Sequence, residues 1–500
     1  MKKYLCAVLA IVMIISSFSF SSAAVSYYGE EEAEFTKGYV YSGEGVINNV
    51  VYCLKNGKTY ANKTKHQYYE IKSLFDSEKT AKNATAIKFV DEINGIPVET
   101  IYMRGVEIPQ ENSKIKKIVL PSKLCSVNKN AFRGLSALET VVFPKNSKKF
   151  ALGEKAFFAL KSLKKVVVRG GAVSIGEEAF EKCTGLENIT FDVESVSFGD
   201  GAFSGCSALK GIKFPAKSSF GDSSFAGTGF ESLSLPATAS FNGESAFSKC
   251  KNLKTVKITA AVPVKKRVLL ADEMFLGCKK LKTVSVSSNV KKLAVCKDAF
   301  KDCTALKSFA YSGGCDLIES GAFENCKSLA SFTLIGNNVK VSNDAFKGCA
   351  ALKKFVIGSR NPEMLKGKAG SFMKYLPKSC KVFVENEKMK TAVKKTGFKG
   401  QVELTEIDVP TVKNLKVAGR KTSKIRLNWD KAKSVTGYVV YCYSPKDKKY
   451  VKLSATDSLT FVAANLKSKT TYKFIVKAYK RVNGNNYYGN ASAVLTSKTR

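Results

Sequence analysis

The chain has 500 residues, and 81 Lys and Arg against 42 Asp and Glu give it a formal net charge of +39. Its 44% hydrophobic content excludes a disordered basic tail, and its length predicts at least two domains because single cores rarely exceed about 250 to 300 residues. Only nine basic residues are Arg and the only histidine is His66, which disfavours base-specific nucleic-acid recognition, histidine metal sites and most histidine-assisted hydrolases.

Residues 1–24 have the layout of a secretory signal peptide. Lys2 and Lys3 precede an apolar stretch that extends to about Phe20, and small residues follow it up to Ala24. We expect cleavage after Ala24 or one residue earlier. An uncleaved membrane anchor is disfavoured because the stretch is short for a span. The mature chain is therefore expected outside the cell, secreted or held at the surface non-covalently, with no membrane span.

Residues 25–87 contain no repeat and are expected to cap the N-terminal end of the domain that follows. They begin with an acidic segment, Glu30 to Glu34. A stacked repeat domain needs such a cap because its open end exposes core and unpaired strand edges. His66 falls in this region, where we expect a structural or solvent-exposed role.

One unit of about 23 residues recurs through residues 88–385. It consists of Ala-Phe, a Cys three residues after the Phe, a Leu six residues after it, and two apolar residues spaced by one, such as Ile189 and Phe191. This alternation predicts a short strand with one buried face, and the Ala-Phe half predicts a tight turn or a single helical turn. Stacked units can share one core, so the pattern predicts an elongated parallel sheet with turns behind it. The repeated phenylalanines are Phe132, Phe157, Phe180, Phe203, Phe225, Phe247, Phe275, Phe300, Phe323, Phe346 and a degenerate Phe372.

A glycine precedes the phenylalanine by four residues in several units. We expect a sharp turn with a positive φ angle at this position. The glycines are Gly153, Gly176, Gly199, Gly221 and Gly243.

Fourteen cysteines in an exported chain would ordinarily suggest disulfides. Seven of them share one repeat position, however, and equivalent side chains of stacked coils point the same way. Their Cβ atoms should lie near the coil spacing, outside the disulfide window of about 3.5 to 4.5 Å. We predict buried free thiols that act as small apolar fillers, with no metal or redox site. The seven are Cys183, Cys206, Cys250, Cys278, Cys303, Cys326 and Cys349.

This combined Phe, Cys and Leu repeat resembles the BspA-like leucine-rich repeats of surface and secreted proteins. The resemblance covers roughly residues 88–385 and includes the segment from Ile93 to Ile101. Leu135, Leu160 and Thr228 depart from it by replacing the cysteine. The resemblance implies a mainly β leucine-rich-repeat solenoid that serves adhesion, or binding of proteins and carbohydrates, without a catalytic site.

Residues 409–500 show alternating strands separated by turns, which predict an antiparallel, immunoglobulin-like β-sandwich. Trp429 comes early in this segment, and Leu466 precedes Tyr472 by six residues. These features resemble a fibronectin type III domain, in which Trp429 would pack in the core and Tyr472 would form the tyrosine corner. Residues 386–408 are expected to cap the solenoid and lead into this domain.

The charge is distributed unevenly. Residues 409–500 hold 16 Lys and 4 Arg against three Asp. In the repeats, the residue after the motif leucine forms a column that alternates in sign through Lys116, Glu139, Lys164, Glu187, Lys210 and Glu231. The column then becomes positive, and an inserted basic segment is expected to extend it into a continuous surface. The predicted ligand-contact residues are Lys254, Lys265, Lys266, Arg267, Lys282, Lys307 and Lys353.

The sequence thus predicts an exported, non-enzymatic binding or adhesion protein with no cofactor. Its partners would be extracellular proteins or glycans, including an anionic wall or matrix, and the basic sandwich would act as a spacer or electrostatic attachment. The alternative is a secreted enzyme or accessory module acting on polysaccharide, for which no pair of carboxylates stands out. Specific nucleic-acid binding is disfavoured by export and by the scarcity of Arg.

Overall fold

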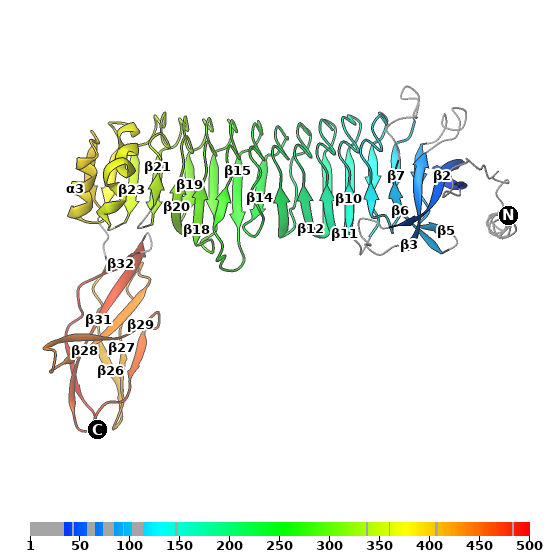
Figure 1. Cartoon of the computed structure of the whole chain (residues 1–500). Helices are drawn as coiled ribbons and strands as arrows, with labels where there is room; N and C mark the ends of the chain where they lie inside the picture. The colour runs from blue at the N-terminus through cyan, green and yellow to red at the C-terminus, as the bar shows by residue number, and fades with distance from the viewer. Residues whose placement is uncertain are drawn as a thin grey trace.

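A computed structural model describes residues 35–42, 45–57, 66–73, 85–93, 95–102, 114–145, 149–336, 339–359, 361–405, 409–482 and 485–500. The expected signal peptide 1–24 and the acidic segment Glu30 to Glu34 lie outside these ranges. The described chain forms a long β-solenoid, with a sandwich attached at its C-terminal end (Figure 1). The mainly β fold class with a parallel solenoid and an antiparallel sandwich is confirmed.

The strand that follows the motif leucine forms the first sheet of the solenoid, in which successive coils pair in parallel. Side chains alternate between core and surface, as in β15, where Val256 and Ile258 are buried. Its strands are β4 (Ala86–Lys88), β7 (Lys117–Val119), β9 (Thr140–Val142), β11 (Lys165–Ile175), β12 (Asn188–Phe198), β14 (Ser232–Pro236), β15 (Thr255–Thr259), β17 (Thr283–Val286), β19 (Ser308–Tyr311), β21 (Ser331–Ile335), β23 (Lys354–Gly358), β24 (Lys381–Val384) and β25 (Gln401–Leu404).

A second parallel sheet lies across the core from the first, where the sequence analysis expected only turns. Its strands directly precede the Ala-Phe turns, and β11 and β12 are long enough to run through both sheets. Short apolar pairs such as Val268 and Leu270 are buried from this side. Besides β11 and β12, its strands are β6 (Ile96–Ile101), β8 (Ser126–Val127), β10 (Phe150–Leu152), β13 (Lys217–Phe220), β16 (Val268–Leu270), β18 (Lys292–Val295), β20 (Gly314–Ile318) and β22 (Lys340–Val341).

The Ala-Phe halves are turns, and their rings stack along the solenoid axis. Neighbouring ring centroids lie 4.8 Å apart at Phe132 and Phe157 and 5.8 Å apart at Phe247 and Phe275. The backbone of one turn also pairs with the next, because the Phe157 N–H donates to the Ala179 carbonyl at 2.8 Å. The turns therefore form a third hydrogen-bonded side of the coil.

The expectation of positive φ at the repeated glycines is wrong. Positive φ occurs instead two residues before and two after the phenylalanine, as at Glu178 (49°) and Lys182 (59°) around Phe180. The glycine is needed for close approach: a Cβ at Gly176 would lie 2.5 Å from the Leu152 carbonyl oxygen of the preceding coil. Backbone packing between coils, and not turn geometry, selects glycine here.

Residues 35–73 contribute three strands, β1 (Phe35–Ser42), β2 (Gly45–Gly57) and β3 (His66–Ser73), which form an antiparallel meander. β1 pairs with β4 in the first sheet, and β3 pairs with β6 in the second. The meander thus occupies the edges of both sheets, as a cap must. A short β5 (Glu92–Ile93) forms a hairpin with β6.

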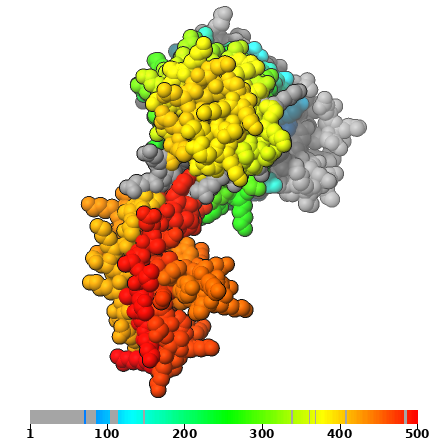
Figure 2. Space-filling model, turned by 90° about the vertical axis from the view of Figure 1, so that its left-hand side faces the viewer, coloured from blue at the N-terminus to red at the C-terminus, as the bar shows by residue number. Residues whose placement is uncertain are grey.

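The C-terminal end departs from the repeat. Two 3₁₀ helices, η2 (Pro362–Leu365) and η3 (Gly367–Tyr375), replace the Ala-Phe turn around the degenerate Phe372. β24 and β25 continue the first sheet, and helix α3 (Glu387–Lys395) lies between them in sequence and buries Met389 and Val393. Figure 2 shows these yellow cap residues covering the end of the solenoid, with the orange and red sandwich extending away from it.

The sandwich consists of two antiparallel sheets. Trp429 is buried between them and meets Tyr438 edge to face, with centroids 5.5 Å apart. The Tyr472 hydroxyl accepts a hydrogen bond from the Lys467 N–H at 2.8 Å, which is the expected tyrosine corner. One sheet contains β26 (Lys416–Arg420), β27 (Ile425–Asn428) and β30 (Thr460–Ala463); the other contains β28 (Gly437–Ser444), β29 (Lys449–Thr456), β31 (Thr471–Val482), β32 (Asn485–Tyr488) and β33 (Leu495–Lys498).

Candidate functional site

The predicted basic residues after the motif leucines do form a column. Each directly precedes a strand of the first sheet, and their backbones are bonded coil to coil: the Lys282 N–H donates to the Lys254 carbonyl at 2.8 Å, and the Lys307 N–H to that of Lys282 at 2.8 Å. Lys353 follows after Ala330, whose carbonyl it contacts at 2.9 Å. We call Lys254, Lys282, Lys307 and Lys353 the lysine column; all four side chains are exposed.

The alternating part of the column is paired across coils. Glu139 accepts from Lys116 at 3.4 Å and from Lys164 at 3.5 Å, and these lysines hold its pKa below the usual range. Lys254 pairs with Glu231 at 2.9 Å. Within the described ranges, by contrast, Lys282, Lys307 and Lys353 form no ion pair. The lysine column therefore ends in three uncompensated ammonium groups.

The inserted basic segment lies elsewhere. Lys265, Lys266 and Arg267 are exposed, but they follow the end of β15, whereas Lys254 precedes its start. The five residues of β15 span about 16 Å, so the two sites lie beyond opposite ends of this strand. Arg267 also pairs with Asp316, Nε to Oδ2, at 3.0 Å. The predicted contact residues thus form two separate basic surfaces instead of a continuous one.

One pair of neighbouring carboxyl groups is relevant to the alternative that the protein is an enzyme acting on polysaccharide. Glu178 and Glu181 are hydrogen-bonded to each other, which lowers the pKa of Glu178, while burial is the main cause that raises the pKa of Glu181. Lys155 pairs with Glu178 at 3.3 Å and Lys182 with Glu181 at 3.0 Å. Glycoside hydrolysis needs carboxyl groups about 5 to 9.5 Å apart around a substrate. Carboxyls in mutual contact within an ion network do not offer that arrangement.

One group of metal-type ligands occurs in the described part of the chain. Ligand atoms of Asp272, Cys296 and Glu319 lie within 4.8 Å of one another. Both carboxylates accept from the Lys297 N–H, at 3.1 and 3.0 Å. Burial, with the two carboxylates, raises the pKa of the Cys296 thiol to about 12. The two carboxylates thus cap the backbone of a turn beside a thiol that burial keeps protonated.

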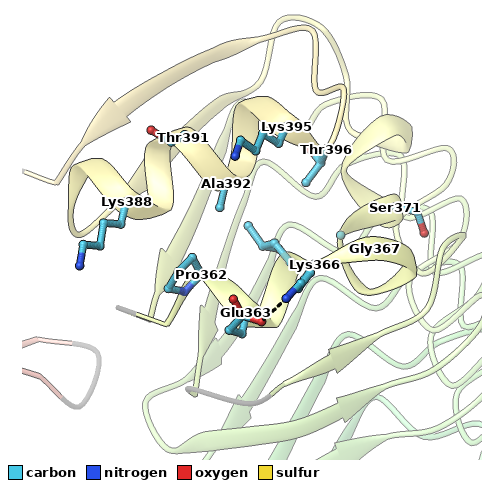
Figure 3. Close-up of a pocket in the computed structure, with 12 residues that line it drawn as sticks. Pro362, Glu363, Lys366, Gly367, Ser371, Lys388, Thr391, Ala392, Lys395 and Thr396 are labelled. Carbon is cyan, nitrogen blue, oxygen red and sulfur yellow. Dashed lines mark ion pairs between the residues drawn. The ribbon is translucent and has the colours of Figure 1, made fainter.

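A hollow of about 620 Å³ lies in the C-terminal cap, between α3 and the two 3₁₀ helices (Figure 3). Its lining includes Glu363, Lys366, Lys388, Thr391 and Lys395. This hollow was not predicted from the sequence. The available signal was the lengthened spacing before Phe372, where the repeat breaks down, but periodicity gives no information on how the following helix packs.

Comparison with known families agrees with this geometry. The family described as BspA type leucine rich repeat region matches residues 110–219, 173–292 and 265–369, which together span more than half of the chain. The chain belongs to the BspA-type leucine-rich repeat family. The fibronectin type III family matches residues 408–494, the sandwich.

The solved structures to which the chain is similar include leucine-rich repeat and fibronectin type III proteins. A leucine rich cell surface protein from Faecalibacterium prausnitzii is 19% identical over 74% of this chain and 96% of its own, with a TM-score of 0.34. The T. pallidum leucine rich repeat protein is 21% identical over 51% of this chain and 87% of its own (TM-score 0.28). The fibronectin type III domain of human fibronectin type III domain containing protein 3 is 16% identical over 19% and 89% (TM-score 0.17). No curated protein matches the chain.

In the BspA-type repeats, the seven equivalent cysteines do more than fill space. Each is buried, and its thiol donates to the carbonyl oxygen of the phenylalanine one coil earlier, as from Cys183 to Phe157 at 3.1 Å and from Cys349 to Phe323 at 3.2 Å. The sequence predicted the burial but not this bond. Burial raises the pKa of the Cys183 and Cys349 thiols to about 12.

Among the helices that the structure describes, none is both long and apolar enough to cross a membrane.

Proposed function

We propose that this BspA-type protein is an exported, non-enzymatic binding protein that holds an anionic glycan or wall polymer on its lysine column. The observation that carries the proposal is the row of uncompensated, exposed ammonium groups at Lys282, Lys307 and Lys353. Successive coils are spaced by about 4.8 Å. Lys282 and Lys307 lie one coil apart and Lys353 lies two coils farther on, beyond Ala330, so the charges are close enough to meet nearby anionic groups of one polymer.

The surface next to the column supports a polar partner. Outward positions of the adjoining strands are small and hydroxylated, as at Thr283, Ser308 and Ser331. The hydroxyls at these positions offer hydrogen bonds to a polar partner. Lysine ammonium groups attract anions without demanding one geometry, which suits a flexible polymer.

The sandwich supports a second electrostatic contact. It has 20 basic residues and only three Asp, and no ion pair occurs within the described part of the sandwich. Asp430 and Asp447 instead accept from Asn414 and Ser444, at 2.7 and 2.8 Å. This uncompensated charge fits a domain that attaches the solenoid to an anionic wall or matrix.

A glycan and matrix-polymer array at physiological salt tests the column. The full-length protein should bind polyanionic components, and the Lys282→Glu/Lys307→Glu/Lys353→Glu variant should lose most of that binding. The matched control reverses Lys291, Lys292 and Lys340, exposed residues at or beside the second sheet, and changes the net charge equally. Equal losses in both variants would show that net charge, and not the column, is responsible.

A further inference from the structure

The hollow in the C-terminal cap combines one face of a helix with a broken repeat. Helix α3 begins at the N-cap Asn386, whose side chain accepts from the Met389 N–H at 2.8 Å. Met389 and Val393 fasten one side of α3 to the core. The lining residues Lys388, Thr391, Ala392 and Lys395 follow the i, i+3, i+4, i+7 spacing, which places them on one stripe of the helix.

Figure 3 shows this stripe across the hollow from Pro362, Glu363 and Lys366, on and beside η2. The opposite wall is rigid, because Pro362 starts η2 and the Asn361 side chain accepts from the Glu363 N–H at 3.2 Å. At Gly370 a Cβ would lie 2.7 Å from Thr396 Cγ2, so glycine permits close contact between η3 and the end of α3. The hollow is thus a product of the fold, existing only where the regular coils end.

The charges of the hollow are unbalanced. Lys366 pairs with Glu363, Nζ to Oε2, at 3.2 Å. Lys388 and Lys395 form no ion pair with any residue in the described ranges. Lys388 and Lys395 therefore line the hollow from one helix stripe without an ion pair, whereas Glu363, the carboxylate among its described lining residues, is already engaged with Lys366. An anionic ligand is the chemical complement.

The remaining lining defines the ligand further. A volume of about 620 Å³ lies in the range of small-molecule sites, about 300 to 1,000 Å³. None of the described residues that line it is aromatic, so they offer no platform for stacking a neutral sugar. Thr391 lies between the two lysines along the helix stripe, and the Thr396 hydroxyl is bonded to the Val393 carbonyl at 2.6 Å. Leu365, Pro362 and Ala392 supply a small apolar floor.

We propose that this hollow is a binding site for an acidic sugar, one residue of an oligosaccharide that carries a carboxylate or a phosphate group. Lys388 and Lys395 bind the anionic group and Thr391 bonds to a ring hydroxyl. The site is separate from the lysine column and goes beyond the proposed function: the column meets a polymer by repeated charge, whereas the hollow takes a single residue.

Calorimetric titration of the full-length protein at physiological salt tests the site. The probes are trigalacturonate, a phosphorylated maltotriose and unmodified maltotriose, which separate carboxylate, phosphate and neutral sugar. Lys388→Gln/Lys395→Gln should weaken binding of an anionic probe about tenfold or more, because two charge-assisted hydrogen bonds are lost. Thr391→Tyr, which fills the hollow from an exposed position, should weaken it as well.

The matched control is Lys394→Gln/Lys399→Gln, which removes the same charge from exposed residues of the same cap that do not line the hollow. This variant should bind like the unaltered protein. The Lys282→Glu/Lys307→Glu/Lys353→Glu variant should also keep the site, so its behaviour separates this proposal from the column. Equal weakening by the control, equal binding of maltotriose, or no binding of either anionic probe would overturn the assignment.

Discussion

Seven of the coils are held to their neighbours by both a stacked phenylalanine ring and a thiol. The phenylalanine rings stack at about 5 Å, as at Phe180 and Phe203 (4.9 Å), and Cys206 donates to the Phe180 carbonyl at 3.2 Å. Where the thiol is absent, Thr228 bonds to the Phe225 carbonyl within its own coil at 3.0 Å and contacts the Cys250 sulfur. The cysteine position is therefore a polar link inside an apolar column.

Ionisation of these thiols should lower the stability of the protein at alkaline pH. Unfolded thiols ionise above about pH 8.5, whereas Cys183 and Cys349 hold their protons until about pH 12. The stabilising effect is thus complete below pH 8.5 and is lost as the pH rises toward 12. By linkage, each thiol should cost about 2 kcal/mol of unfolding free energy at pH 10.

Denaturant unfolding under reducing conditions at pH 7.5 and pH 10 measures this loss. The Cys183→Ser/Cys349→Ser variant keeps two donors that do not titrate, so its stability should change less between the two pH values. An identical pH dependence in the variant and the unaltered protein would refute the assignment.

The close contact between the repeated glycine and the backbone of the preceding coil leads to a separate prediction. In Gly176→Ala the new Cβ would meet the backbone of Leu152 and Gly153, at 2.5 and 2.7 Å, and backbone cannot rotate away. We expect a loss of about 1 to 3 kcal/mol, as for overpacking. Gly211→Ala is the control, because nothing lies within 4 Å of its Cβ position. Equal melting temperatures for the two variants would contradict the explanation.

Along the first sheet, the charges of the lysine column favour binding of polyanions, but their mutual repulsion should lower the stability of the solenoid. In Lys282→Glu, the new carboxylate would sit between Lys254 and Lys307 and restore the alternation seen around Glu139. The variant should be as stable as the unaltered protein or more stable by about 0.2 to 1 kcal/mol, yet bind polyanions less. A thermal melt together with a polyanion titration checks both effects. Lower stability would show that the surplus charge has a structural role.

The strands were predictable to different degrees. Alternation at Ile189 and Phe191 indicated the first sheet, and the recurring Phe, Cys and Leu indicated the stack. The second sheet was missed, although Val196 and Phe198 alternate in the same way, because the analysis assigned that half of the unit to turns. The repeated glycine could be recognised in the sequence, but the reason for it could not, because the contact between coils depends on where the backbone of the neighbouring coil lies.

The hollow in the C-terminal cap is harder still to predict from the sequence. It requires α3 to pack beside η2 and η3, residues about 25 positions apart whose pairing no periodicity encodes. The position of the basic insert was also not predictable. Lys265, Lys266 and Arg267 are near Lys254 in sequence, but β15 lies between them, so the insert follows the opposite end of this strand. Local patterns predict elements, whereas surfaces depend on how the elements stack.

Over the whole molecule, the surplus charge is concentrated on the lysine column, in the C-terminal cap and on the sandwich. The ion pairs of Glu139 and Glu231 neutralise part of the alternating charges that precede the lysine column, while the sandwich has three Asp for 20 basic residues. Uneven charge of this kind attracts polyanions at range and weakens as salt screens it.

Salt extraction from cells that produce the protein tests the central claim most directly. The screening length falls from about 10 Å at 0.1 M salt to about 3 Å at 1 M, so surface attachment by uncompensated lysines should be lost over this range. We predict that the full-length protein is released into the medium at roughly 0.3 to 0.5 M sodium chloride without detergent. Retention through 1 M salt would contradict electrostatic attachment to an anionic surface.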